Sequence, residues 1–444
     1  MSLYRNIHPF TYMPPTSETT PEKIEQDNVC LVRGNGSWVY DKHDHSYLYA
    51  TTAVPTLGVS NPDILSPLFE QYKTLSFSST CGQTHEHLLP LSEKLMEITD
   101  HRFEKVFFSN DGSGAIETAL KLVRQYYQLK GQPEKTKFIS FDGNYHGTTL
   151  ATGAVTHMGI QESFGPSLDG CIKVPTPDLY RPPVQGTEDE LVTYCLNELE
   201  DKIVKENPAT IAALLIEPIQ GVNGIIVQPS TFFPALRNLA TKYDIQLIAD
   251  EVTTGIGRMG TWTASEAYGI DPDLLVLSKG LTGGYFPMGA TLFSKSISEV
   301  IFGNGNVFLH GSTQCGHPVA CTAALTILRL IESQNILDNV VTEGSHILNS
   351  FRESLKNHPN VGDIRGKGLM MAIEFVEDKE TKEKTSFDFG ARLSKLLHRY
   401  GILGNYFNSI LVLYPPLNIS RDESIYLIEN VVAAINQLKV EGTV

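Results

Sequence analysis

Two charged side chains each end a run of apolar residues. Asp250 follows IQLIA, and Lys279, 29 residues further on, follows LLVLS. A lysine whose pKa is lowered by burial can attack a carbonyl carbon. A semi-buried carboxylate needs a cationic or N–H partner. Taken alone, each residue is more often an ordinary paired group. Taken together, they indicate one shared partner.

A third segment could bind an anion. The sequence NDGSG (110–114) lies between an expected strand at 103–110 and an expected helix at 114–128. A helix N-terminus presents free N–H groups, so Gly112 and Ser113 fit a phosphate. A simple Asp or Ser N-cap would explain the same residues. A lysine, a carboxylate and a phosphate cradle together match pyridoxal 5'-phosphate, which has an aldehyde, a ring nitrogen and a phosphate.

The elements that position these groups alternate along the chain. Apolar runs that end in polar residues predict buried parallel strands, and the segment between the second and third of them, 231–243, has helical spacing. These runs are KFISFDG (137–143), IAALLIEPI (211–219), IQLIADEV (245–252) and DLLVLSKG (273–280). Ligands of open α/β sheets bind beyond the carboxyl ends of the strands. The polar ends are therefore expected to converge.

The predicted fold is α/β, with a large domain and a smaller one. Residues 1–60 are expected to form an N-terminal arm and part of the small domain, with a hairpin at 36–54. Residues 61–325 are expected to form the large cofactor-binding domain, and residues 326–444 a small α+β domain.

Composition excludes several other classes of protein. The net charge of −15 argues against nucleic-acid binding. Six cysteines without a CxxC pair indicate reduced thiols and no metal site. No signal peptide or long apolar run is found, so no membrane association is expected and a cytoplasmic protein is predicted. Gly255, Gly257 and Gly260 do not have the order of a nicotinamide loop, and the segment 261–273 after them is expected to be a loop.

Several motifs, in order along the chain, resemble class III aminotransferases, which are pyridoxal-phosphate enzymes of fold type I. The resemblance is to the branch of amine and ω-amino acid transaminases and diaminopelargonate aminotransferases. The motifs are HPFTYM (8–13), FFSNDGSGAIETALKLVR (107–124), YHGTTLA (145–151), IEPIQGVNG (216–224), LIADEVTTGIGRMGTW (247–262) with GIDPDLLVLSKGLTGGYFPMGA (269–290), HGSTQCGHPVACTAAL (310–325), VGDIRGKGLMMAIEF (361–375) and YPPLNIS (414–420). The resemblance implies a mainly parallel sheet of seven-stranded type flanked by helices, and a small α+β domain built from both chain ends.

The resemblance also implies roles for individual residues. Lys279 would form a Schiff base with the cofactor and move the proton, and Asp250 would pair with the ring nitrogen. Tyr145 and Val252 would flank the ring, while Gly112 and Ser113 would bind the phosphate.

Four further residues complete these implied assignments. Thr313 would reach the phosphate of the other subunit in a homodimer with shared active sites. Glu217 would support the site from a strand end. His146 would be either a functional or a structural histidine, and Arg365 would be mainly structural.

The sequence departs from the family where relatives bind the substrate. The arginine that clamps a substrate carboxylate is missing. The departures are Asn405 and Val412 at the two clamp positions, Thr148 after Tyr-His-Gly, Thr52 and Ala53 in place of an aromatic wall, and Thr253 in place of a glutamine. They predict a wider pocket for a larger amine or ω-amino substrate whose carboxylate is absent or held elsewhere.

The leading hypothesis is a ping-pong aminotransferase acting on an amine donor and an aldehyde or keto acceptor. A mutase, decarboxylase, racemase or epimerase would keep the same lysine and aspartate and stays open as an alternative. A non-catalytic cofactor-binding scaffold is the third class.

Overall fold

The core of the protein is a seven-stranded sheet with the order β4-β12-β11-β10-β7-β5-β6. The computed structural model describes residues 7–10, 20, 24 and 28–441, so the HPFTYM motif lies partly outside it. The strands are β4 (Lys105–Ser109), β5 (Lys137–Phe141), β6 (Cys171–Val174), β7 (Ile211–Ile216), β10 (Gln246–Asp250), β11 (Leu274–Leu277) and β12 (Gly289–Phe293). Strand β12 runs antiparallel to both neighbours, and the other pairs are parallel. The mainly parallel sheet is therefore confirmed.

Helices cover both faces of this sheet. Successive strand residues point to opposite sides, so each face carries apolar side chains that pack against helices. Phe138 packs with α4 (Gly112–Leu129) and α9 (Lys295–Phe302), whereas its neighbour Ile139 packs with α6 (Glu188–Lys205) and α7 (Phe232–Lys242). Leu275 and Leu277 join a larger core with α3 (Leu88–Ile98) and α10 (Pro318–Ser333). These strands read as unbroken apolar runs because both of their faces are buried.

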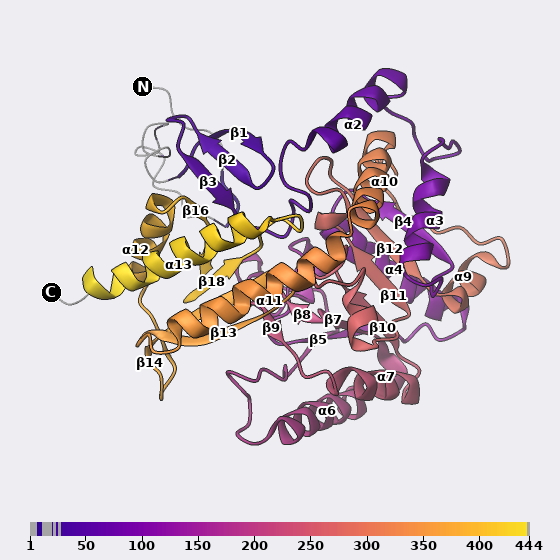
Figure 1. Cartoon of the computed structure of the whole chain (residues 1–444). Helices are drawn as coiled ribbons and strands as arrows, with labels where there is room; N and C mark the ends of the chain where they lie inside the picture. The colour runs from indigo at the N-terminus through magenta and orange to yellow at the C-terminus, as the bar shows by residue number, and fades with distance from the viewer. Residues whose placement is uncertain (1–6, 11–19, 21–23, 25–27, 442–444) are drawn as a thin grey trace.

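A smaller α+β part lies beside the large sheet (Figure 1). Its five-stranded sheet joins β13 (Val361–Lys367), β14 (Met370–Asp378), β18 (Ile410–Leu413) and β17 (Asn405–Phe407), with β15 (Glu383–Lys384) paired to β14. Its helices are α11 (Ile336–Leu355), α12 (Phe387–Arg399) and α13 (Arg421–Glu441).

Both ends of the chain contribute to this part. Strands β1 (Leu31–Asn35), β2 (Trp38–Asp41) and β3 (Ser46–Tyr49) form a sheet that β16 (Ile402–Leu403) completes in parallel with β3. Figure 1 shows these strands next to α12 and α13. The antiparallel pairing of β2 with β3 confirms the expected hairpin. The exact domain boundaries at 60 and 325 stay a prediction.

The remaining elements are short or connect the others. They are α2 (Pro62–Thr74), α5 (Leu150–Ala154), η1 (Gln161–Phe164), η2 (Pro208–Thr210), β8 (Ile219–Gln220), β9 (Ile226–Val227), α8 (Ala264–Tyr268) and η3 (Lys279–Leu281). Along the described ranges, no helix is both long and apolar enough to cross a membrane.

Helix α8 contradicts the expected loop at 261–273. Its start is stabilised by polar groups, because Thr263 caps the N–H of Glu266, while Glu251 accepts from the N–H groups of Ala264 and Ser265. The left-handed Gly269 ends it. Capping rather than apolar spacing forms this helix, so periodicity alone could not predict it.

Candidate active site

Residues from four strand ends surround one cavity of about 370 Å³. Its lining includes seven of the residues predicted from the sequence: Gly112, Ser113, Tyr145, His146, Asp250, Val252 and Lys279. Neighbouring strands β10 and β11 place Asp250 and Lys279 at the same edge of the sheet. Glu217 and Thr313 do not line the cavity. The predicted convergence of strand ends is therefore observed in the fold.

Lys279 follows β11 in a conformation that L-residues rarely adopt. Its φ is +32°, and strained backbone of this kind is typical of functional sites. The amine Nζ donates a 2.6 Å hydrogen bond to Oγ1 of Thr253. Burial lowers the pKa of Lys279, although the nearby carboxylates of Glu217 and Asp250 act to raise it. A lysine that loses its proton more easily is a better nucleophile toward a carbonyl group.

Asp250 is a buried carboxylate held by two donors. Its Oδ1 accepts from the backbone N–H of Val252 at 3.0 Å, and its Oδ2 lies 2.7 Å from Nδ1 of His146. The His146 side chain has no exposed surface. Both contacts hold the carboxylate at the cavity wall, where it can accept a hydrogen bond from a protonated ring nitrogen.

The first turn of α4 is the segment expected to bind an anion, and it packs closely against its neighbours. Asp111 caps the helix by accepting from the N–H of Gly114 at 2.7 Å. A Cβ on Gly112 would lie 3.1 and 3.2 Å from the methyl groups of Val252. The Asp N-cap is therefore present, and phosphate binding at the remaining N–H groups of this helix terminus stays a prediction.

Glu217 lies behind the cavity and positions the backbone around it. Its Oε1 accepts from the N–H of Tyr145 at 2.7 Å, and its Oε2 accepts from the N–H of Gly221 at 2.9 Å. Burial raises the pKa of Glu217 to about 7, and these two N–H donors oppose that change. Glu217 thus fixes the segment that carries Tyr145, and a direct contact with the cofactor stays a prediction.

The two positions of the missing clamp face each other across neighbouring strands. Asn405 of β17 pairs with Val412 of β18, and Val412 packs in an apolar cluster with Ala53 and Tyr414. Among the cavity-lining residues that the structure describes, Lys279 is the one lysine or arginine.

Val412 of β18 is opposite Ala372 of β14, and Ala372 is opposite Arg365 of β13. Arg365 therefore lies in the same row across the five-stranded sheet as the clamp positions. Its Nε donates to the carbonyl of Gly224 at 2.8 Å, and its Nη1 contacts Asp363 at 2.9 Å and Glu374 at 2.6 Å. These contacts support the structural interpretation of Arg365.

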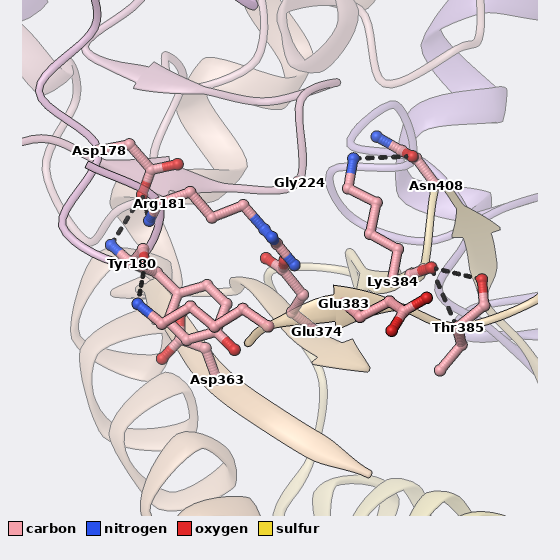
Figure 2. A network of polar contacts seen from close by, with 12 residues as sticks. Asp178, Tyr180, Arg181, Gly224, Asp363, Glu374, Glu383, Lys384, Thr385 and Asn408 are labelled. Atoms are coloured by element: carbon pink, nitrogen blue, oxygen red, sulfur yellow. Dashed lines mark hydrogen bonds and ion pairs between the residues drawn. The ribbon is translucent and has the colours of Figure 1, made fainter. Parts of the chain in front are cut away.

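Arg181 contacts the carboxylate of Glu374 from another segment of the chain. Figure 2 shows it extending toward Glu374, to which its Nε donates at 2.6 Å. The network joins the five-stranded sheet to the loop between β8 and β9.

Sequence reasoning missed some of the polar residues around the site. Thr253 was noted only as a departure from relatives, but it is the acceptor for the Lys279 amine. Asn144 lies next to Tyr145 in the motif DGNYHG and contacts His146. Gln220 contacts Asn144 in turn. The proximity of Asn144 to the Tyr-His-Gly motif was the available signal.

The fold and site define a class of protein. The mainly parallel seven-stranded sheet brings a half-buried lysine, a buried aspartate and a helix terminus to one cavity. This is the arrangement of fold-type I pyridoxal-phosphate enzymes. The model of the family Aminotransferase class-III matches residues 20–435. The chain belongs to this family, whose members depend on pyridoxal phosphate.

Curated relatives and solved structures agree with this assignment. The chain is 35% identical to an adenosylmethionine-8-amino-7-oxononanoate aminotransferase of Geobacter sulfurreducens, covering 97% of this chain and 95% of the relative. It is 33% identical to a putrescine–pyruvate aminotransferase of Pseudomonas aeruginosa, covering 93% and 91%. An amine transaminase of an uncultivated Pseudomonas species, solved in its PLP-bound form, has a TM-score of 0.91 and 34% identity, covering 98% of this chain and 100% of that one.

Proposed function

We propose that the enzyme transfers an amino group from an amine donor to an aldehyde or keto acceptor by a ping-pong mechanism. Lys279 would hold the cofactor covalently and then shuttle the proton. The observation that carries this proposal is the single cavity shared by the half-buried Lys279, the buried Asp250 and the first turn of α4. An amine and a carboxylate at neighbouring strand ends match the two reactive ends of the cofactor.

The residues present fit pyridoxal phosphate. Gly112 and Ser113 lie at a helix terminus that would bind the phosphate, and a side chain at position 112 would be in tight contact with Val252. Tyr145 and Val252 both line the cavity and would flank the ring. When bound, pyridoxal phosphate withdraws electrons from the donor, so that a C–H proton becomes removable.

The proposed work of the protein is positioning and proton transfer. With the donor bound in its place, the Lys279 amine would act as the base that accepts a proton from the donor carbon. Thr253 is in place to accept a hydrogen bond from that amine. The carboxylate of Asp250 would stabilise the proton on the ring nitrogen, because it is buried and stays close to that position.

The proposed donor is larger than a small α-amino acid, or has no carboxylate near the amine. Val412 is buried in an apolar cluster at one clamp position, and no arginine lines the cavity among the described residues. A carboxylate there would lose its hydration without gaining a partner. Relatives named for amines and for putrescine support this proposal.

The proposal includes a homodimer with shared sites and a cytoplasmic location. Thr313 is exposed and does not line the cavity of its own chain, as expected for a residue that reaches a partner's site. The six cysteines, all of them unpaired, are typical of a reducing compartment.

A screen of matched donors tests the proposal. The holoenzyme is incubated with straight-chain amines and with amino acids of the same carbon number, with pyruvate or 2-oxoglutarate as acceptors, and products are measured by mass spectrometry. We expect nitrogen transfer, and faster turnover of the long amines. If alanine with 2-oxoglutarate reacts as fast as the long amines, the substrate proposal is refuted. If no donor transfers its nitrogen, the proposed reaction is refuted.

A variant sharpens this test. Asn405 is exposed and outside the cavity lining, so Asn405→Arg tests whether a long side chain from this strand can reach a donor carboxylate without burying a charge. It is expected to raise kcat/KM for carboxylate-bearing donors about tenfold relative to the matched amines, since a charged hydrogen bond contributes about 1.5–3 kcal/mol. Asn405→Gln is the size-matched neutral control and should leave the ratio unchanged.

A further inference from the structure

A line of hydrogen-bonded side chains leads away from Asp250 into the protein. Asp250 contacts His146, whose Nε2 lies 3.1 Å from Nδ2 of Asn144. Oδ1 of Asn144 accepts from Nε2 of Gln220 at 2.5 Å, and Oε1 of Gln220 accepts from Asn223 at 2.8 Å. Asn144 and Gln220 are fully buried, and neither of them lines the active-site cavity.

The backbone carbonyl of Asp142 determines which atoms donate and which accept along this line of hydrogen bonds. Nε2 of Gln220 lies 2.8 Å from the carbonyl oxygen of Asp142, which can only accept a hydrogen bond. The hydroxyl of Thr176 donates to the same carbonyl at 2.7 Å, so its oxygen has no proton to offer Gln220, and the two N–H groups of Gln220 are shared among Asp142, Thr176 and Asn144. The amide nitrogen of Gln220 is therefore fixed on this side. The atom of Asn144 that faces it must be the oxygen.

The protonation of His146 follows from this direction. With its oxygen turned to Gln220, Asn144 presents its NH₂ group to His146, and an amide nitrogen cannot accept a hydrogen bond. Nε2 of His146 therefore accepts, and the proton of the neutral ring lies on Nδ1, which donates to Asp250. A doubly protonated ring would direct an N–H at the NH₂ group of Asn144.

We propose that Asn144 is a positioning residue that holds His146 as the neutral, Nδ1-protonated tautomer, so that Asp250 keeps its full negative charge for the ring nitrogen. The inference rests on the proposed function, because it assigns Asp250 to that nitrogen. An imidazolium at His146 would instead compete with the ring nitrogen for the carboxylate.

Two other titratable groups lie near His146. Burial lowers the pKa of His157 to about 4, so this histidine is uncharged near neutral pH. Burial raises the pKa of Glu217 to about 7, so near neutral pH this carboxyl is only partly ionised and favours an imidazolium less than a fully charged carboxylate would. The hydrogen bond from Asn144 must therefore outweigh a partial negative charge at Glu217.

The decisive variant is Asn144→Asp. A carboxylate has nearly the same shape, and one of its oxygens can still accept from Gln220. Its other oxygen can only accept, so it requires a proton on Nε2 of His146. Asn144→Asp is thus expected to convert His146 to the doubly protonated form, with Asp250 on one side and the new carboxylate on the other.

The tautomer is read by NMR of full-length protein labelled with ¹⁵N-histidine, in the cofactor-free form at neutral pH. His146→Gln assigns the signal by its disappearance. We expect a neutral Nδ1–H ring in the wild type and an imidazolium in Asn144→Asp. An Nε2–H or charged ring in the wild type, or an unchanged ring in the variant, would overturn the proposal.

Two further variants keep the test decisive if Asn144→Asp fails to fold. Asn144→Ala removes both the NH₂ group that faces Nε2 of His146 and the oxygen that accepts from Gln220, so Nε2 is no longer kept from carrying a proton. A ring that shows no protonation of Nε2 in this variant would overturn the proposal. Asn223→Ala is the control at the far end of the line. It should leave the His146 signal unchanged, because the carbonyl of Asp142 rather than Asn223 sets the direction.

Kinetics separate this inference from the proposed function. In the holoenzyme, Asn144→Asp is expected to lower kcat about 10–100-fold, since an adjacent opposite charge changes proton affinity by 1–3 pK units. KM for the amine should change by less than about twofold, because Asn144 does not line the cavity. An unchanged kcat would overturn the proposal. A wild type without transaminase activity would refute the proposed function and leave the tautomer result intact.

Discussion

Thr253 is the residue through which the protein acts most directly on the proposed base. Thr253→Val keeps the shape of the side chain but removes the acceptor for the Lys279 amine. Loss of this bond is expected to lower kcat about tenfold, because hydrogen bonds to charged groups contribute about 1.5–3 kcal/mol. Steady-state kinetics with the best donor measure the effect. Thr253→Ser keeps the hydroxyl and should stay within about twofold of the wild type; equal losses in both variants would contradict the prediction.

Glu217 predicts a specific dependence of stability on pH. Its pKa rises from 4.5 to about 7 on folding, so the folded state binds the proton more tightly. The stability that this group contributes is complete below its unfolded pKa and is lost as the pH rises through 7. Thermal unfolding of the cofactor-free wild type and Glu217→Gln should therefore show a larger advantage of the wild type at pH 5 than at pH 8.

Glu217→Gln also tests how Glu217 supports the cofactor cavity. A glutamine nitrogen cannot accept from the N–H groups of Tyr145 or Gly221, so one backbone donor loses its partner. The dissociation constant of pyridoxal phosphate is expected to rise about tenfold. A stability difference that does not vary with pH would show that Glu217 titrates normally.

At the scale of elements, Arg365 joins the five-stranded sheet to the loop between β8 and β9. Its side chain is 10% exposed, and that of Glu374 is 3% exposed. Arg365→Met would leave the buried Glu374 paired with Arg181 alone, and loss of the Arg365 contact is expected to cost about 1.5–3 kcal/mol of unfolding free energy. Urea unfolding measures this. Adding Glu374→Gln should recover part of the loss, whereas simple additivity of the two changes would contradict the coupling.

Sequence patterns predicted the elements that carry the chemistry because those elements are fully buried. Strands such as β7 and β11 read as unbroken apolar runs, and their polar ends lie at one edge of the sheet. Helix α8 could not be predicted in this way, because its first N–H groups are satisfied by Glu251, which follows β10 and lies outside the helix. The line from Gln220 to His146 was equally hidden, since it depends on which segments meet in space.

At the scale of the whole molecule, shared active sites predict complementation between two inactive chains. Lys279→Ala should abolish turnover, and Thr313→Arg should impair phosphate binding in the partner's site. Dimers mixed from both variants would contain one intact site each. After random mixing of equal amounts, about a quarter of wild-type activity is expected, since half of the dimers are mixed. Mixtures no more active than their components would refute shared sites, and mass measurement in solution tests the dimer itself.

The pairing of β16 with β3 has a consequence for how the chain is made. Strand β3 is synthesised early, but its parallel partner emerges about 350 residues later, which corresponds to roughly 20–70 s of translation. During that time one edge of the N-terminal sheet has no neighbour, and open strand edges promote association with other chains. The yield in cells is therefore expected to depend on how well this open strand edge is protected while the chain is still being synthesised.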